Sequence, residues 1–114
     1  MATKVGLKEQ DEQQIITHLY TLVCNTYALY FNMLNCHWNI EAPAFSALHE
    51  MLEDQYQTLA GNGDQLAERI RMMGQKVPTS IQQFAEKGNS AAIDSHASWQ
   101  EMLQHLIAGH KHAI

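Results

Sequence analysis

Apolar residues recur every three or four positions along the first third of the chain, which is the period of a helix with one buried face. No glycine or proline interrupts the pattern between Glu9 and Trp38, so it predicts one helix of about 30 residues. The pattern breaks over residues 39–43, because the residue before Pro43 is disfavoured in the helical region. The stripe consists of Ile15, Leu19, Leu22, Tyr30 and Met33, with Ile16, Val23, Leu29 and Leu34 beside it.

A second helix is predicted from near Pro43, a residue tolerated at the first helical position, to a stop at Gly74. Gly61-Asn62-Gly63 disturbs this prediction, because two glycines cost a helix about 2 kcal/mol and Asn-Gly is also a turn signal. The apolar stripe nevertheless keeps its phase across the glycines, so we favour one continuous helix. The predicted core stripe is Phe45, Leu48, Leu52, Leu59, Leu66, Ile70 and Met73.

The last third of the chain predicts a long connection over residues 75–93, with one helical turn around Ile81 and Phe84, and then a third helix. That helix should begin near Asp94, a suitable N-cap, and run to the end of the sequence. Two long helices, a short connecting helix and part of a third predict an all-α protein, an up-and-down bundle that lacks its last member.

Charge is distributed unevenly along the sequence. The formal net charge is −5, and no lysine or arginine occurs between Lys8 and Arg69. Such a stretch repels phosphate and attracts cations, which weighs against a DNA-binding module. No apolar run approaches the roughly 18 residues of a membrane span, and the N-terminus lacks the order of a secretory signal, so a cytoplasmic protein without membrane contact is expected. Cys24 and Cys36 lie too far apart along one helix to form a disulfide.

Four residues with side chains that bind metals follow one face of the predicted second helix. His49, Glu53, Asp64 and Glu68 lie at roughly 0°, 40°, 60° and 100° around its axis. His37, at the end of the first helix, could join His49 across the loop at 39–43. Imidazole with carboxylate suits iron, zinc or manganese better than calcium. Each residue taken alone is more typical of a solvated helix face or a hydrogen-bonded core histidine.

Within one straight helix, these four side chains cannot all bind the same ion. From Glu53 to Asp64 a straight helix rises about 16 Å, whereas metal–ligand bonds are about 2 Å long. If two copies cross antiparallel near residues 58–59, His49 and Glu53 of one copy meet Asp64 and Glu68 of the other. Ala60, Gly61 and Gly63 would then allow close approach. The alternative is a helical hairpin that turns at the glycines, in which all four side chains converge within one chain.

Two long motifs resemble the Dps family of mini-ferritins. One runs from His37-Trp38 to His49-Glu50-Met51-Leu52-Glu53, and the other runs from Asp64-Gln65-Leu66-Ala67-Glu68-Arg69 to Gly74. The similarity covers essentially the whole chain. The resemblance therefore implies a single ferritin-like domain over residues 1–114. Because family members continue for a further helix beyond the position of Ile114, this domain is expected to be incomplete at its C-terminus.

The resemblance also implies a site and an activity. His37, His49 and Glu53 correspond to ligands from one subunit, and Asp64 and Glu68 to ligands from its two-fold partner. The family oxidises Fe(II) to Fe(III), preferentially with hydrogen peroxide rather than oxygen, and stores the ferric product in a dodecamer. This chain is therefore expected to be an iron-binding ferroxidase that protects against oxidative stress, with zinc as a possible substitute metal.

This chain is expected to differ from the family in DNA binding and in assembly. Lys4 and Lys8 provide too little positive charge beside Glu9, Asp11 and Glu12 to bind DNA appreciably at physiological salt. A chain without the last helix puts the dodecamer in doubt, while a site built by a dimer could survive. The competing interpretation is a non-catalytic metal-binding or nucleoid-associated helical protein that does not oxidise iron.

Overall fold

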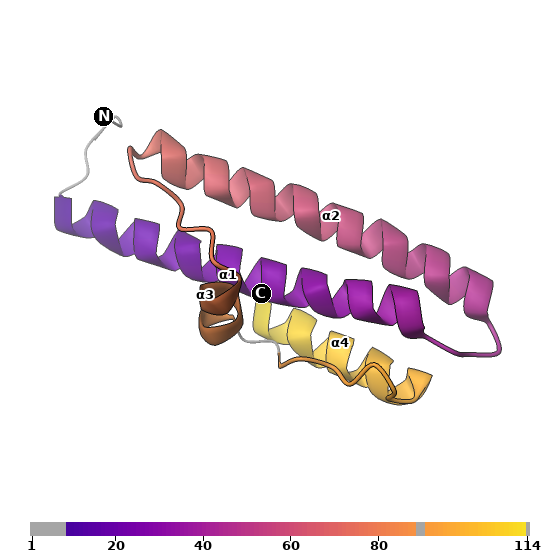
Figure 1. The fold of residues 1–114 in the computed structure, drawn as a ribbon. Coiled ribbons are helices and arrows are strands. Elements are labelled where there is room, and N and C mark those ends of the chain that lie inside the picture. Colours follow the sequence, from indigo (N-terminus) through magenta and orange to yellow (C-terminus); the bar gives the residue numbers. More distant parts are fainter. Residues whose placement is uncertain (1–8, 89–90, 114) are drawn as a thin grey trace.

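The structure, a computed structural model, describes residues 9–88 and 91–113. This part of the chain contains no strands and four helices, which are α1 (Glu9–Asn39), α2 (Phe45–Met72), α3 (Ile81–Lys87) and α4 (Trp99–Ala113). Figure 1 shows α1 and α2 as a long antiparallel hairpin, while α3 and α4 pack against α1 on its other side. The predicted all-α fold and the two long helices are therefore confirmed.

The start of α2 differs from the prediction. The helix begins at Phe45 rather than at Pro43, because Ala44 has φ −101° and ψ 46°, outside the helical region. Pro43 and Ala44 instead form the turn that reverses the chain between α1 and α2. The two helices are thus joined by only five residues, which brings the end of α1 close to the first turns of α2.

The end of α2 agrees with the prediction of a glycine stop. Gly74 has φ 86°, a left-handed conformation that glycine adopts without steric cost. Its N–H donates to Arg71 O at 3.0 Å, and the next N–H, of Gln75, donates to Ile70 O at 3.3 Å. This pair of bonds is a Schellman motif, which satisfies the last carbonyl groups of the helix.

The helix α2 continues through Gly61-Asn62-Gly63, so the continuous helix is confirmed and the hairpin that turns at the glycines is wrong. A Cβ atom on Gly63 would lie 2.7 Å from Cε2 of Tyr27 on α1, whereas a Cβ on Gly61 would meet nothing within 4 Å. Gly63 therefore permits close packing of α1 and α2 within one chain, rather than the contact between two copies expected for it. Gly61 is exposed, and its expected role stays a prediction.

The start of α4 is a second correction. The helix begins at Trp99 instead of near Asp94, because Ser98 and Glu101 form a capping box. Glu101 N–H donates to Ser98 Oγ at 3.2 Å, and Ser98 N–H donates to Glu101 Oε1 at 3.4 Å. Asp94 uses its carboxylate in the preceding turn, where it accepts from His96 N–H at 2.9 Å.

The core follows α1 along its length. One cluster joins Met33 and Cys36 of α1 to Leu52 of α2 and to Met102 of α4, and a second surrounds Cys24. Both cysteines are free, as their separation along α1 predicts. Burial raises the pKa of the Cys36 thiol to about 11, which keeps it protonated and a poor metal ligand at neutral pH. No described helix combines the length and the apolar character needed to span a membrane.

Candidate metal centre

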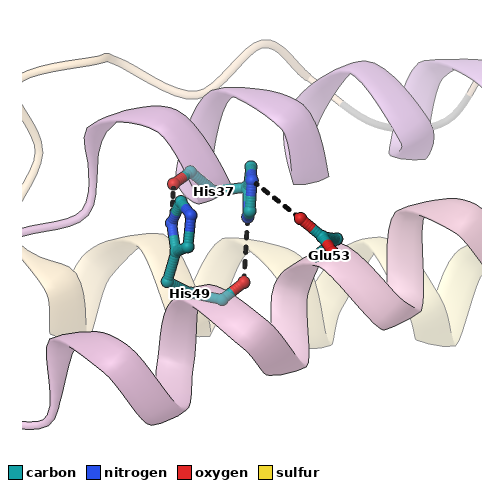
Figure 2. Close-up of polar contacts among 3 residues, drawn as sticks. All are labelled: His37, His49 and Glu53. Atoms are coloured by element: carbon teal, nitrogen blue, oxygen red, sulfur yellow. Dashed lines mark hydrogen bonds and ion pairs between the residues drawn. The ribbon is translucent and has the colours of Figure 1, made fainter.

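The short α1–α2 turn brings His37 and His49 face to face. Their rings stack with centroids 3.7 Å apart and planes inclined by 19°. Each ring also bonds to the backbone of the other residue, since His37 Nδ1 lies 2.9 Å from His49 O and His49 Nδ1 lies 2.8 Å from His37 O (Figure 2). The two histidines thus hold each other through two symmetrical side chain–backbone bonds across the turn.

These two bonds determine which nitrogen of each ring is available. A carbonyl oxygen only accepts hydrogen bonds, so each Nδ1 must be the protonated donor. In the neutral form of each ring, Nε2 then carries a lone pair and no proton. Histidines that ligate metals through Nε2 typically donate a hydrogen bond from Nδ1, which fixes the tautomer in this way. Both Nε2 atoms therefore have a lone pair that could bind a cation.

Glu53 faces the free nitrogen of His37. Its Oε1 atom lies 3.7 Å from His37 Nε2, too long for a hydrogen bond (Figure 2). A lone pair opposite a carboxylate is unfavourable unless a proton or a cation lies between them. Because bonds from a transition metal to histidine nitrogen and carboxylate oxygen are each about 2 Å long, one ion could bind both atoms with small adjustments. The Glu53 side chain is 48% exposed, whereas that of His37 is 7% exposed, so the carboxylate borders solvent.

Aromatic side chains hold the histidine pair from both sides. Phe45 stacks on His49 with a centroid separation of 5.1 Å, and Tyr56 contacts the ring of His37 edge-on at 5.2 Å. The sequence prediction placed Phe45 in the core stripe, but it is 45% exposed and packs on the histidine instead. The sequence spacing is consistent with these ring contacts, because Phe45 precedes His49 by four residues and Tyr56 follows Glu53 by three.

Asp64 and Glu68 lie apart from this group. Both are exposed on α2, and eleven residues of continuous helix separate Glu53 from Asp64, a rise of about 16 Å. Within the described ranges, no three His, Cys, Asp or Glu side chains are grouped closely enough to hold a metal ion. One copy of the chain therefore presents two partial ligand sets at separate places on α2. With α2 unbroken, the two sets cannot converge within one chain.

The described histidines outside this group, His18, His96 and His105, are exposed. His105 is exposed on α4, and the side chains of His110 and His112 lie outside the described residues. Trp38, which follows His37 directly, is 68% exposed at the end of α1. The chemistry-bearing surface of the described chain is thus centred on His37, His49 and Glu53.

Residues 16–114 of the chain match the ferritin-like domain family. The chain belongs to the ferritin-like family. This ferritin-like chain is similar to the structure of a Dps protein from Vibrio cholerae O1, with a TM-score of 0.89 and 25% identity over 98% of this chain and 70% of that one. The Vibrio protein is described as a member of a broad superfamily of ferritin-like diiron-carboxylate proteins.

Two sequence relatives of the ferritin-like chain complete the comparison. A DNA protection during starvation protein of Brevibacillus brevis is 29% identical over 101 residues, covering 89% of this chain and 68% of that protein. An uncharacterized low temperature-induced protein of Nostoc is 29% identical over 114 residues, covering 96% of this chain but only 62% of its own length. The resemblance to Dps mini-ferritins is therefore confirmed, and the chain spans less than two thirds of the Nostoc relative.

Proposed function

We propose that this chain is the subunit of a mini-ferritin that oxidises Fe(II) at sites shared by two copies. His37, His49 and Glu53 of one copy and Asp64 and Glu68 of its two-fold partner bind the iron. The observation that carries the proposal is the pair of reciprocal bonds between the two histidines, which leaves both Nε2 atoms free to bind a cation. The same nitrogen and oxygen donors accept zinc, so zinc should compete with iron.

The separation of the two ligand sets along α2 supports the two-fold arrangement. An antiparallel copy related by a two-fold axis would present Asp64 and Glu68 to the histidine end of the first copy, and the reverse. The exposed Gly61, between the two sets, offers no side chain to keep the helices apart. Each dimer would then contain two equivalent sites, each with two imidazoles and three carboxylates.

The reaction proceeds by electron transfer from the bound iron to peroxide. Each of two Fe(II) ions loses one electron, and hydrogen peroxide accepts both electrons and two protons as its O–O bond breaks, which yields two waters. Two Fe(III) ions remain, and their hydrolysis gives the mineral that an assembly of copies retains. Oxygen is the slower alternative oxidant. Asp64 and Glu68, being exposed, would attract the incoming cations.

Protection against oxidative stress would follow from this consumption of Fe(II) and peroxide rather than from binding along DNA. The relative from Brevibacillus is named for DNA protection during starvation. Consumption of Fe(II) and peroxide removes the two reactants that damage DNA, and it requires no contact with DNA. The absence of lysine and arginine between Lys8 and Arg69 supports this distinction, since phosphate binding depends on such side chains.

A ferroxidase assay tests the proposal. Ferric absorbance is followed after Fe(II) and peroxide are added anaerobically to the wild type and to the double variant His37→Ala/His49→Ala. We expect the double variant to lose the protein-dependent rate, while His105→Ala, a change at an exposed histidine on α4, should leave it unchanged. Equal rates in all three proteins would remove the histidine pair from the mechanism. Zinc binding without any protein-dependent iron oxidation would favour the non-catalytic alternative.

A further inference from the structure

A polar pocket of about 250 Å³ lies between the α1–α2 turn and the segment that leads into α4. Asn39 and Glu41 line it from the end of α1 and the turn, and residues 95–99 line it from the segment. Figure 1 shows the turn and the start of α4 at the same end of the bundle. None of the described residues that line the pocket is a proposed iron ligand, so it is separate from the histidine pair.

Asn35, four residues before Asn39 on α1, joins the two walls of this pocket. Its Oδ1 atom accepts from Asn39 Nδ2 at 2.8 Å and from Ser95 Oγ at 3.1 Å. Its own Nδ2 atom donates to Ile93 O at 2.7 Å, which holds the chain two residues before Ser95. These bonds connect the end of α1 to a segment almost 60 residues away, and they shape the pocket without any ligand.

The side chains that line the pocket use their hydrogen-bond donors within the protein. Asn39 Nδ2 donates to the backbone oxygen of Asn35 at 3.0 Å as well as to its side chain. The Ser95 hydroxyl is engaged by Asn35 Oδ1, and the Ser98 hydroxyl donates to Glu101 Oε1 at 3.0 Å. A hydroxyl has one proton and an amide nitrogen has two, so Asn39, Ser95 and Ser98 have no side-chain donor left for a ligand.

Three acceptor groups in the same pocket remain unused. Within the described residues, no hydrogen bond or ion pair engages Asn39 Oδ1, the Glu41 carboxylate or the ring of His96. A neutral imidazole has one nitrogen that accepts, and the carboxylate adds a negative charge. No lysine or arginine is among the described lining residues. Oxygen and nitrogen acceptors without a cationic neighbour favour a positively charged ligand.

We propose that this pocket, which we call the turn site, binds one divalent transition-metal ion through Glu41, His96 and Asn39 Oδ1, with water completing the coordination. Imidazole with carboxylate and amide oxygens suits Mn²⁺, Fe²⁺, Co²⁺ or Zn²⁺. A water occupies about 30 Å³, so the pocket has room for the ion and several waters. Only two of its ligands are of the His, Cys, Asp or Glu type, which agrees with the lack of a group of three in the described chain.

The turn site is independent of the proposed iron chemistry, because the two sites share no ligand. Glu41 comes from the α1–α2 turn and His96 from the segment before α4, so a bound ion would join two parts of the chain far apart in sequence. An ion that binds only the folded chain stabilises it. The turn site is therefore expected to raise the Tm when it is filled.

A Co²⁺ titration tests the turn site, with Trp99 as the reporter. The chain has two tryptophans, and Trp99 lines the pocket, so Trp38→Phe leaves one tryptophan beside the proposed ion. Co²⁺ accepts the same ligands, is stable in air and quenches tryptophan fluorescence at short range. The full chain with Trp38→Phe is the parent protein, and equilibrium dialysis counts the bound ions.

The pocket variant is Glu41→Gln/His96→Gln in the parent, and the matched control is Glu50→Gln/His105→Gln. All four positions are exposed, so both variants should fold. A third protein, His37→Ala/His49→Ala in the parent, removes the histidines of the proposed iron site. Circular dichroism checks the fold, and Asp64→Asn/Glu68→Gln, at exposed positions, replaces the third protein if it does not fold.

We expect Co²⁺ to quench Trp99 saturably in the parent and to raise its Tm. The pocket variant should bind Co²⁺ at least about tenfold more weakly, because loss of a partner outside the ligand shell already costs that much. It should also bind one ion fewer per chain in dialysis. The control variant and the protein without the iron-site histidines should keep the quenching.

Several results would overturn the turn site. Quenching that is unchanged in the pocket variant, or reduced equally in the control variant, would exclude Glu41 and His96 as ligands. Quenching that never saturates would show adventitious binding only. Quenching lost with the iron-site ligands would place the ion at that site instead. A failure of protein-dependent iron oxidation, with saturable quenching intact, would refute the proposed function and leave the turn site standing.

Discussion

Replacement of Gly63 by alanine tests how closely α1 and α2 pack. The new Cβ atom would lie 2.7 Å from Cε2 and 2.9 Å from Cζ of Tyr27, much closer than van der Waals contact. The tyrosine ring cannot retreat freely, because Phe84 stacks on it at 5.3 Å and Tyr30 contacts it at 5.9 Å. The substitution therefore overpacks the interface near the middle of the hairpin.

The magnitude follows from two opposing effects. Overpacking of a well-packed interior costs about 1–3 kcal/mol, while alanine in place of glycine inside a helix is worth about 1 kcal/mol. Gly63→Ala should therefore lower the free energy of unfolding by up to about 2 kcal/mol. Gly61→Ala is the matched control two residues away, and since its Cβ meets nothing within 4 Å, it should raise that free energy by up to about 1 kcal/mol.

Urea and thermal denaturation followed by circular dichroism measure both variants. Each kcal/mol should shift the Tm of a domain of this size by about 4 °C, so the two substitutions should move the Tm in opposite directions. In a Tyr27→Ala background, Gly63→Ala should lose its cost, because the ring that it overlaps is gone. A Gly63→Ala protein as stable as Gly61→Ala would refute the close approach of the helices at this point.

Three further predictions concern caps, pH and DNA. Ser98→Ala should lower the free energy of unfolding by about 1 kcal/mol in urea denaturation, since it removes the N-cap of α4. Burial raises the pKa of Cys36 from 9.0 to about 11 and that of Tyr20 to about 12, so at high pH the folded chain keeps protons that the unfolded chain has lost. The free energy of unfolding should therefore be full below pH 9 and decline as the pH rises toward 11. Cys36→Ala should flatten the pH dependence of the Tm. A gel shift should detect no tight, salt-sensitive DNA binding, and a strong shift abolished by salt would contradict the charge argument.

The long helices could be predicted from the sequence because their apolar period persists over many turns. The phase of the stripe from Leu52 to Leu66 outweighed the local turn signal of Gly61-Asn62-Gly63, and the structure has a single helix there. The ends of the helices are harder to predict from the sequence than their middle turns. Asp94 and Ser98 are both suitable caps, and only the reciprocal bonds with Glu101 select Ser98.

The proximity of His37, His49 and Glu53 could be predicted from the sequence, but the detail of their contacts could not. A five-residue turn leaves little freedom, so the approach of His37 to His49 follows from the chain reversal. The reciprocal bonds to backbone carbonyl oxygens depend on backbone positions that no side-chain pattern encodes.

The central claim, that two copies share each iron site, is tested most directly by mixing two inactive variants. One carries His37→Ala/His49→Ala, and the other carries Asp64→Asn/Glu68→Gln. In a mixed dimer, one site combines both defects and the other combines the intact histidine set with the intact carboxylates. If random exchange makes half of the dimers mixed, about a quarter of the wild-type ferroxidase activity should return. Activity that stays absent after exchange, with mixed dimers verified by mass spectrometry, would contradict the shared site.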